Sequence, residues 1–323
     1  SKNLKDWSLL SEFANQGDKR KPWECPSLTE LPVEGSNTSK WVLMLSSNGS
    51  TEGYTGMQYF VGDFDGTHFK LDPSFEKDLS NSEHKSIWID YGRDNYAGVT
   101  WANIPDTNGR KLFMGWMSNW DYSQKVPTFK WRSAMTVARS VELRKIDNNY
   151  KLVFQPVKEL SNYRSVKYKK DAISIKRTEK IIDSKAIDLS STEINFKILD
   201  LKNSGFNFKL SNKQGDTLIF GYDNTNNNFF IDRRKSGKID YSENFANRVS
   251  MAKRTSLNPN LEAKIILDKT SIELFFDNGE TVMTEIFFPR SPFSELIIEP
   301  KSQEFILDNL ELHQLNINQT KLK

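Results

Sequence analysis

Hydrophobic residues in this chain gather into short runs, and turn-forming residues separate them. Four such runs lie in the first half, at 41–45, 57–62, 98–102 and 112–117. The second run leads into Asp63-Phe64-Asp65-Gly66, and an Asp-Gly pair between strands is a hairpin signal. Short strands at close spacing predict an all-β fold, which leaves a sandwich, a barrel and a propeller as candidates.

The pattern changes after about residue 160. Tryptophan disappears, Lys, Asn and Ile become common, and polar and apolar residues alternate in 206–210. Apolar-rich strands are predicted at 217–222 and 264–268. This half therefore favours an antiparallel β-sandwich in which each sheet has one solvated face. Two domains, 1–160 and 161–323, are predicted, with a short helix only in the linking stretch 155–171.

Composition narrows the classes of function. The 323 residues include 45 basic and 42 acidic side chains, a net charge of +3, so no nucleic-acid partner is expected. No apolar run is long enough for a membrane span, and the N-terminus has no signal-peptide pattern. The 21 Phe, 10 Tyr and 8 Trp residues suit β-structure and also carbohydrate binding, in which rings stack on sugar faces.

Cys25 is the only cysteine, which excludes an internal disulfide. A nucleophilic cysteine would need a histidine partner, and the three histidines lie far from it in sequence. We therefore assign Cys25 to packing. The scarcity of histidine also argues against a His-rich metal site, and no cofactor is predicted.

The candidate chemistry begins at Trp23-Glu24-Cys25-Pro26. Burial beside apolar groups raises the pKa of a carboxylic acid, and such a group can deliver a proton near neutral pH. A strand-edge glutamate beside an aromatic core is the alternative, and the residue types alone favour that alternative.

The same run resembles the acid/base signature of glycoside hydrolase family 32, the invertases, inulinases and levanases that hydrolyse β-fructosides. Further segments follow in the family's order at 56–66, 90–97, 117–120, 131–136, 222–223, 230–233, 236–237 and 271–275. The resemblance covers nearly the whole chain. It implies a partial five-bladed β-propeller, about the last two blades, followed by a C-terminal β-sandwich.

The resemblance also implies roles for single residues. Glu24 would protonate the leaving oxygen and then activate water as a base. Asp90 would order the sugar pocket with Arg93 as its ion-pair partner, unless it only caps a turn. Trp120 would pack on the substrate, with a place in the core as the alternative, and Asn119 beside it would also bind the substrate. Ser27 stands where many family members have an aspartate.

Two family motifs are missing from the chain. The nucleophile lies in an Asn-Asp-Pro motif and the transition-state carboxylate in an Arg-Asp-Pro motif, whereas the only Asp-Pro here is Asp72-Pro73, after Glu24. The resemblance thus predicts a fragment of a secreted or periplasmic β-fructosidase that begins near the end of the third blade. Such a fragment is expected to be inactive alone.

Three hypotheses follow for how the chain works. It is part of an exo-acting, retaining hydrolase of fructose-containing oligo- or polysaccharides. Alternatively, it is a non-catalytic carbohydrate-binding or assembly subunit, or an enzyme completed by another polypeptide. An open propeller exposes strand edges and apolar faces, so self-association or a complementing chain is expected.

Overall fold

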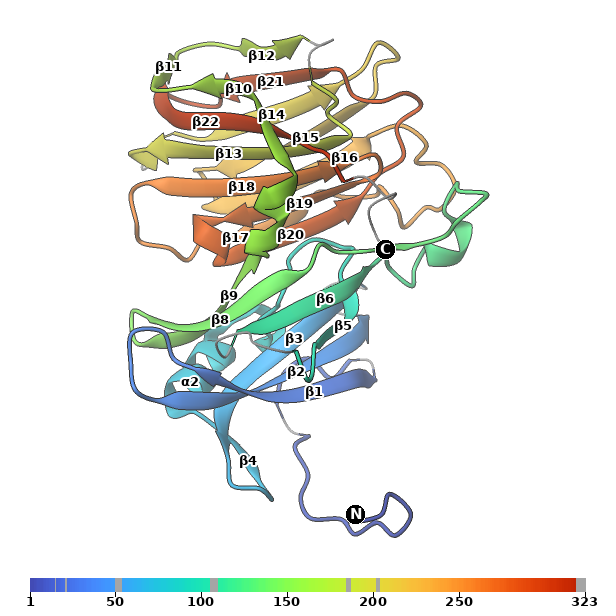
Figure 1. The fold of residues 1–323 in the computed structure, drawn as a ribbon, viewed down its shortest axis with the longest axis vertical. Coiled ribbons are helices and arrows are strands. Elements are labelled where there is room, and N and C mark those ends of the chain that lie inside the picture. Colours follow the sequence, from blue (N-terminus) through green and yellow to red (C-terminus); the bar gives the residue numbers. More distant parts are fainter. Residues whose placement is uncertain are drawn as a thin grey trace.

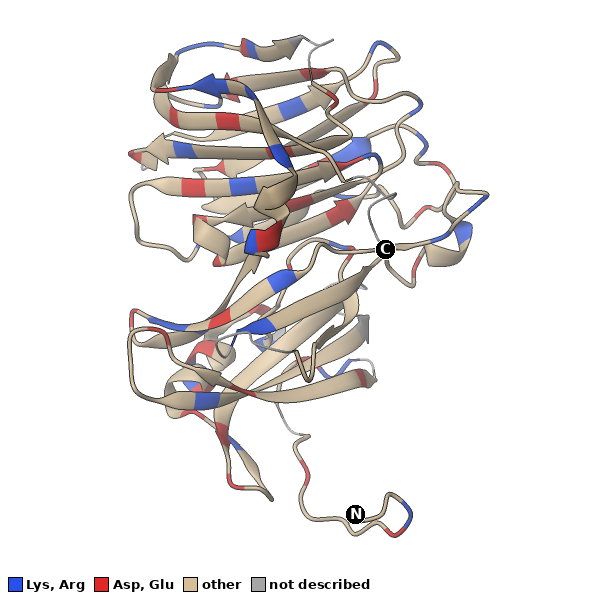
Figure 2. Cartoon of the chain, in the orientation of Figure 1, with Lys and Arg blue, Asp and Glu red and all other residues tan. Residues whose placement is uncertain are grey.

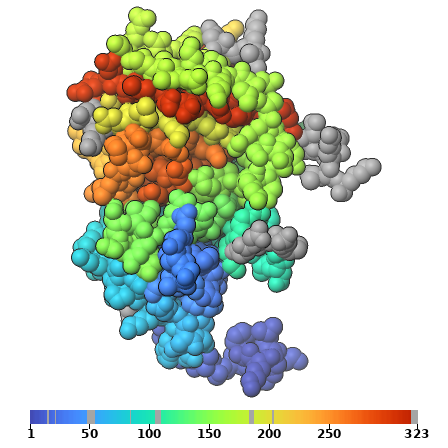
Figure 3. All heavy atoms as spheres, turned by 60° about the vertical axis from the view of Figure 1, so that its left-hand side comes forward, coloured from blue at the N-terminus to red at the C-terminus, as the bar shows by residue number. Residues whose placement is uncertain are grey.

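Antiparallel sheets form nearly all the regular structure, in two parts stacked along the long axis of the molecule (Figure 1). The structure is a computed structural model that describes residues 1–14, 16–20, 22–49, 54–104, 110–183, 187–201 and 204–317. The N-terminal end projects away from the body, whereas Phe13 already packs against Phe60 and Phe69 (Figures 1 and 3). The all-β prediction is confirmed.

The N-terminal part contains two small sheets whose strands follow one another in sequence. The first sheet has the order β1 (Trp23–Pro32), β2 (Ser39–Gly49), β3 (Tyr54–Phe64) and β4 (Phe69–Leu71). The second has the order β5 (Tyr96–Thr100), β6 (Lys111–Met117), β8 (Arg139–Ile146) and β9 (Asn149–Pro156), with β7 (Ala134–Met135) paired to β6. Four-stranded meanders are the form of a propeller blade. Their membership of a partial propeller stays a prediction.

One hydrophobic core joins these two sheets because their strands alternate between inward and outward side chains. In β8, Val141 and Leu143 are buried, while Glu142 between them is partly exposed. They share a cluster with Phe60 of β3 and Phe154 of β9. The same cluster includes Phe275 from the second part of the molecule, so the core continues across the junction.

Helix α2 (Pro73–Asn81) was not predicted from the sequence. Asp72 caps it by accepting a hydrogen bond from the backbone N–H of Ser74 at 2.9 Å, and Pro73 occupies the first turn, where its missing N–H costs nothing. The Asp-Pro pair therefore begins a helix, and Phe75 and Leu79 anchor it in the core.

Four short 3₁₀ segments complete the helical structure of the described residues, namely η1 (Glu83–Lys85), η2 (Ser123–Lys125), η3 (Lys158–Tyr163) and η5 (Asp277–Gly279). The segment η3 lies in the stretch predicted to hold a short helix. The proposed domain boundary at 160 falls inside it and stays a prediction. No helix in the described ranges is long and apolar enough to cross a membrane.

The C-terminal part consists of two sheets that share a core. One has the order β10 (Arg164–Lys170), β22 (Phe305–Leu315), β13 (Ser191–Leu199), β18 (Leu261–Asp268), β19 (Ser271–Phe276) and β20 (Thr281–Ile286), and β11 (Ile173–Ile175) also pairs with β22. The other has the order β12 (Glu179–Asp183), β21 (Glu295–Pro300), β14 (Phe206–Ser211), β15 (Thr217–Asp223), β16 (Asn228–Lys235) and β17 (Ser250–Lys253). Phe196 of the first sheet and Phe208 of the second pack at 4.8 Å between ring centroids. The core between the sheets is that of a sandwich.

A loop of the N-terminal part lies along β20, the last strand of its sheet. The backbone N–H groups of Tyr91 and Asp94 donate to the carbonyls of Val282 and Thr284 at 2.8 and 3.1 Å. Gly92 is required here, because a Cβ at this position would lie 2.1 Å from the Thr284 carbonyl oxygen. We call residues 90–94 the strap, and it covers the edge of the sheet.

Candidate active site

A β-bulge presents Glu24 at the surface. In the pairing of β1 with β2, Glu24 lies opposite Ser46 and Ser27 opposite Met44, so two residues of β1 face one residue of β2. Cys25 lies in the bulge with a positive φ of 49°, and Pro26 has no backbone N–H that could donate to β2. Bulges re-aim side chains, and here the Glu24 side chain is exposed.

Tyr96 of β5 holds the Glu24 carboxylate. Its hydroxyl donates to Glu24 Oε2 at 2.5 Å, and only 2% of the tyrosine is exposed. Burial, together with this hydrogen bond, raises the pKa of Tyr96 well above its ordinary value, so the phenol remains a proton donor. Sequence reasoning did not single out Tyr96, although it lies inside the segment 90–97.

Aromatic rings extend from this hydrogen bond toward Trp120. The ring of Tyr96 lies 6.4 Å from that of Trp116, and Trp116 lies 5.0 Å from Trp120. Trp120 is 49% exposed, and Met135, the residue opposite Trp116 on β7, is 53% exposed. The structure therefore places an open apolar wall beside the carboxylate, which suits the face of a sugar ring.

Two expectations about the run at Trp23 are wrong. Trp23 packs against Phe60 at 5.8 Å and donates from Nε1 to the Asp18 carbonyl at 2.6 Å. Neighbouring side chains on a strand point to opposite faces, so Trp23 does not shield Glu24. Cys25 is exposed rather than packed in the core, because the bulge turns it outward.

Asp90 begins the strap and is buried in a set of protein donors. Its Oδ1 accepts from the backbone N–H groups of Gly92 at 2.9 Å and Thr284 at 2.7 Å. Its Oδ2 accepts from Asn95 at 3.1 Å, the Thr284 hydroxyl at 2.6 Å and Arg139 at 3.0 Å. A carboxylate has about four lone-pair positions, and five donors fill them. Contact with a sugar would have to displace one of these donors.

Arg139, rather than the expected Arg93, forms the ion pair with Asp90. Arg139 also binds Glu273 of β19, with Nη2 to Oε2 at 2.6 Å, and all three side chains are buried. Burial raises the pKa of Glu273, and Arg139 opposes that shift. The arginine of β8 thus joins a carboxylate of the strap to a carboxylate of the sandwich.

Arg93 and Asn119 lie in a buried layer below Trp120. The Arg93 guanidinium donates to the carbonyls of Asn244 at 2.5 Å and Phe245 at 3.0 Å. Asn119 Nδ2 donates to the Arg93 carbonyl at 2.9 Å. These contacts fix the backbone that presents Trp120. The structure therefore links Glu24 to Trp120 through Tyr96 and Trp116, and both end residues are exposed. Asp90, Arg93 and Asn119 are buried.

Both parts of the chain are similar to domains of one known protein family. Residues 1–156 match the family described as Glycosyl hydrolases family 32 N-terminal domain, and residues 159–314 match Glycosyl hydrolases family 32 C terminal. The chain belongs to glycoside hydrolase family 32. The resemblance seen in the sequence is confirmed.

Relatives of this family 32 chain include a levanase and an exo-inulinase. A levanase from Bacillus subtilis strain 168 is 37% identical over 98% of the chain, and an extracellular exo-inulinase from Aspergillus awamori is 33% identical over 90%. The chain spans about half the length of these relatives, 46% of the first and 54% of the second.

Solved structures agree with the fold of this family 32 chain. The crystal structure of exo-inulinase from Aspergillus awamori superposes with a TM-score of 0.85 at 29% identity, over 98% of this chain and 61% of the other. A β-fructofuranosidase from Schwanniomyces occidentalis, complexed with fructosyl-erythritol, gives a TM-score of 0.80 at 28% identity over 97% and 64%.

A second buried network lies at the junction of the two parts of this family 32 chain. Arg233 of β16 donates from Nη1 to Asp94 at 2.6 Å and from Nη2 to the Tyr122 hydroxyl at 2.8 Å. Its Nε lies 3.4 Å from Oε2 of Glu285, and the other carboxylate oxygen of Glu285, Oε1, accepts a hydrogen bond from the Ser250 hydroxyl. Burial, opposed by Arg233, raises the pKa of Glu285 to about 7.

The raised pKa of Glu285 predicts a pH-dependent stability. Since the folded state binds this proton more tightly than the unfolded state, the free energy of unfolding should fall as pH rises from about 4.5 to above 7, by roughly 3 kcal/mol. Arg233, Asp94, Arg93 and Ser250 face the group. Urea unfolding of wild type and Glu285→Gln at pH 5 and pH 8 measures the effect. Equal pH slopes in the two proteins would rule out this source of the dependence.

Proposed function

We propose that this chain forms the acid/base side of an active site that hydrolyses β-fructosides. The hydrogen bond from Tyr96 to Glu24 carries the proposal, because it fixes an exposed carboxylate beside the open wall of Trp116 and Trp120. Membership of family 32 and the names of the relatives support the choice of substrate. Relatives described as extracellular support a secreted or periplasmic location.

Glu24 acts first as a general acid. Protonated Glu24 donates its proton to the glycosidic oxygen, the bond to the fructosyl anomeric carbon breaks, and a second carboxylate takes up the fructosyl group. Tyr96 donates to Oε2, which orients the carboxyl group and stabilises its negative charge once the proton has left. Ionised Glu24 then removes a proton from water, which attacks the covalent intermediate with overall retention of configuration.

Trp120 is the residue that we propose to touch the sugar. About half of the Trp120 side chain is exposed, and its ring packs against that of Trp116. This contact holds the exposed apolar face of the ring in a fixed orientation. For Asp90, Arg93 and Asn119 we propose an indirect part in substrate binding. Their hydrogen bonds hold the strap and the backbone before Trp120 in place.

The second carboxylate is proposed to come from outside these 323 residues. A retaining enzyme needs it about 5–5.5 Å from the acid/base. No Asn-Asp-Pro or Arg-Asp-Pro motif occurs in the sequence, and the carboxylate of Asp72 caps α2 and pairs with Lys40. A complementing polypeptide or a second copy would also cover the exposed side chains near Trp120, among them Trp131 and Met135.

Fructose release is the test of this function. The purified 323-residue chain should elute from size-exclusion chromatography as an oligomer and release no fructose from levan, inulin or sucrose. A fusion that adds an N-terminal family 32 segment with the Asn-Asp-Pro motif should release fructose from these substrates and no sugar from α-glucans.

Other results of this experiment would change the proposal. Turnover by the unfused chain, lost in Glu24→Gln, would show that the second carboxylate lies within these residues. A folded fusion that binds fructans without cleaving them would favour the carbohydrate-binding subunit. A monomeric, non-aggregating chain would remove the need for a covering partner.

A further inference from the structure

The sandwich carries a polar cleft on its outer face, away from Glu24. The cleft has a volume of about 330 Å³, which is within the range of small-molecule sites. Strands β13, β18 and β22 form its floor, and β9 and η5 form one wall. In Figure 1 β13, β18 and β22 belong to the upper part of the molecule, whereas β1 and β9 lie in the lower part.

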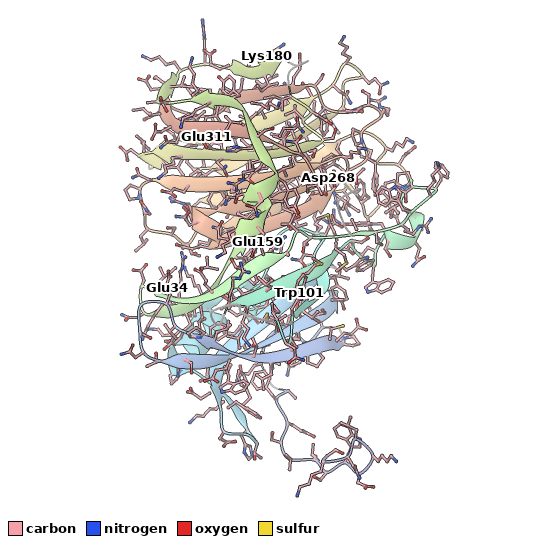
Figure 4. All side chains as sticks on the ribbon, viewed as in Figure 1. Glu34, Trp101, Glu159, Lys180, Asp268 and Glu311 are labelled. Carbon is pink, nitrogen blue, oxygen red and sulfur yellow. The ribbon has the colours of Figure 1, made fainter. Side chains whose placement is uncertain are left out.

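Strand register explains why polar groups line this floor. Asn195 of β13 lies opposite Glu311 of β22 on one side and Lys264 of β18 on the other. Their neighbours in sequence, such as Phe196 and Ile265, point into the sandwich core. Figure 4 labels Glu311 on β22 in this region. Because successive side chains of a strand point to opposite faces, the polar residues of these strands lie together on the outer face.

The wall is fixed by a close backbone contact. Gly279 of η5 lies against β9, where an added Cβ would be 1.9 Å from the Phe154 carbonyl oxygen. This approach brings Asn278 and Gln155 to the rim of the cleft. Within the described part of the chain, neither of these two side-chain amides makes a hydrogen bond to the protein.

Two groups on the floor are also without partners. Asn195 Oδ1 is buried and accepts no hydrogen bond, although its Nδ2 donates to Glu193 at 2.9 Å. Lys264 is largely buried, and no carboxylate of the described residues lies within 4 Å of its ammonium group. That burial lowers the pKa of Lys264. An unpaired acceptor and an unpaired donor thus lie on adjacent strands, and such groups are costly unless a ligand or water pairs them.

Charge selects a neutral ligand. Lys197 pairs with Glu262 at 2.5 Å, and Glu311 pairs with Lys169 at 2.8 Å. Figure 2 shows an acidic and a basic position side by side on β18. Among the residues that line the cleft, Glu262 and Glu311 are acids and Lys197 and Lys264 are bases, so neither an anion nor a cation is strongly preferred. Hydroxyl groups, which both donate and accept, match uncommitted amides, an ammonium group and a carbonyl oxygen.

We propose that this cleft binds a short segment of a fructan chain, separately from the site at Glu24. The choice of a fructan rests on the proposed function, whereas the preference for a neutral polyhydroxylated ligand rests on the cleft alone. Hydroxyls of the sugar accept from Lys264 and donate to Asn195 Oδ1, and Gln155 and Asn278 bind from the rim. The sandwich would thereby retain the polymer while its end is processed elsewhere.

Isothermal titration calorimetry of the 323-residue chain with short fructo-oligosaccharides tests this cleft. Lys264→Met and Asn195→Ala should each weaken binding about tenfold, because each removes one hydrogen-bonding group. Lys209→Met, on the outer face of the other sheet, should leave the affinity unchanged. A thermal unfolding transition is measured for every variant to establish that the variant is folded. Lys264→Met should retain the fold, because it removes a buried charge that lacks a partner.

Each outcome decides between the hypotheses. Binding that persists in both cleft variants, or no binding of any oligosaccharide, overturns the site. Equal affinity for maltotriose overturns the assignment to fructan. If the fusion releases no fructose while the wild-type cleft still binds fructo-oligosaccharides in a Lys264-dependent way, the proposed hydrolysis fails and the cleft stands.

Discussion

Arg139→Met is expected to lower the free energy of unfolding by about 3–5 kcal/mol, because it leaves Asp90 and Glu273 buried without their cation. The side chain of Arg139 is fully buried, and its partners come from both parts of the molecule. Methionine fills a similar volume but offers no donor, so the loss reflects the carboxylates rather than a cavity. Urea denaturation at neutral pH measures the change.

A matched variant lies on the same strand. Arg144 of β8 also pairs with two carboxylates, Glu34 and Glu142, but these are roughly half exposed. Arg144→Met should therefore cost less than about 1 kcal/mol. Adding Glu273→Gln to Arg139→Met should recover part of the loss. Equal costs at the two arginines would contradict the view that burial makes this network important.

Glu24→Gln is expected to reduce kcat on levan or sucrose by about 10²–10⁴-fold in the fusion protein described above. Glutamine keeps the shape of the side chain but can neither donate the proton to the leaving oxygen nor accept one from water. A β-fructoside with a nitrophenol leaving group needs little protonation, so its bond cleavage should be much less affected. Steady-state assays on both substrates measure this difference.

Two further variants separate the acid from its surroundings. Glu30→Gln changes another exposed carboxylate on β1 and should leave kcat unchanged. Tyr96→Phe removes the hydrogen bond to Oε2 and should lower kcat by about tenfold with little change in KM, since it disturbs the acid and not the binding wall. A kcat retained in Glu24→Gln would assign the acid/base to another residue.

Local patterns were sufficient to predict several of the strands. The alternation at 206–210 became β14, where Phe206, Phe208 and Leu210 point into the core. Helix α2 was missed because only Phe75 and Leu79 are buried in it, and its start depends on the cap by Asp72 rather than on a hydrophobic stripe. A weak amphipathic pattern with a strong cap is hard to recognise by periodicity.

The site was predictable in its parts but not in its assembly. Glu24 could be named from a contiguous motif, whereas Tyr96, which holds it, is 72 residues away. The segment 90–97 was recognised, yet the partner of Asp90 was expected at Arg93 and is Arg139, with Thr284 194 residues away. Sequence distance cannot show which side chain a loop meets when it lies along a strand of another sheet.

The strap has a consequence for how the molecule can be divided. Residues 90–94 occupy the edge of β20, and Asp90 and Asp94 accept hydrogen bonds from backbone N–H groups of that strand. The sandwich is therefore completed by a segment of the N-terminal part. Cutting the chain at the linker would leave an unpaired edge and several stranded polar groups. The C-terminal half is therefore not expected to fold as an independent unit, and a domain exchange should include the strap.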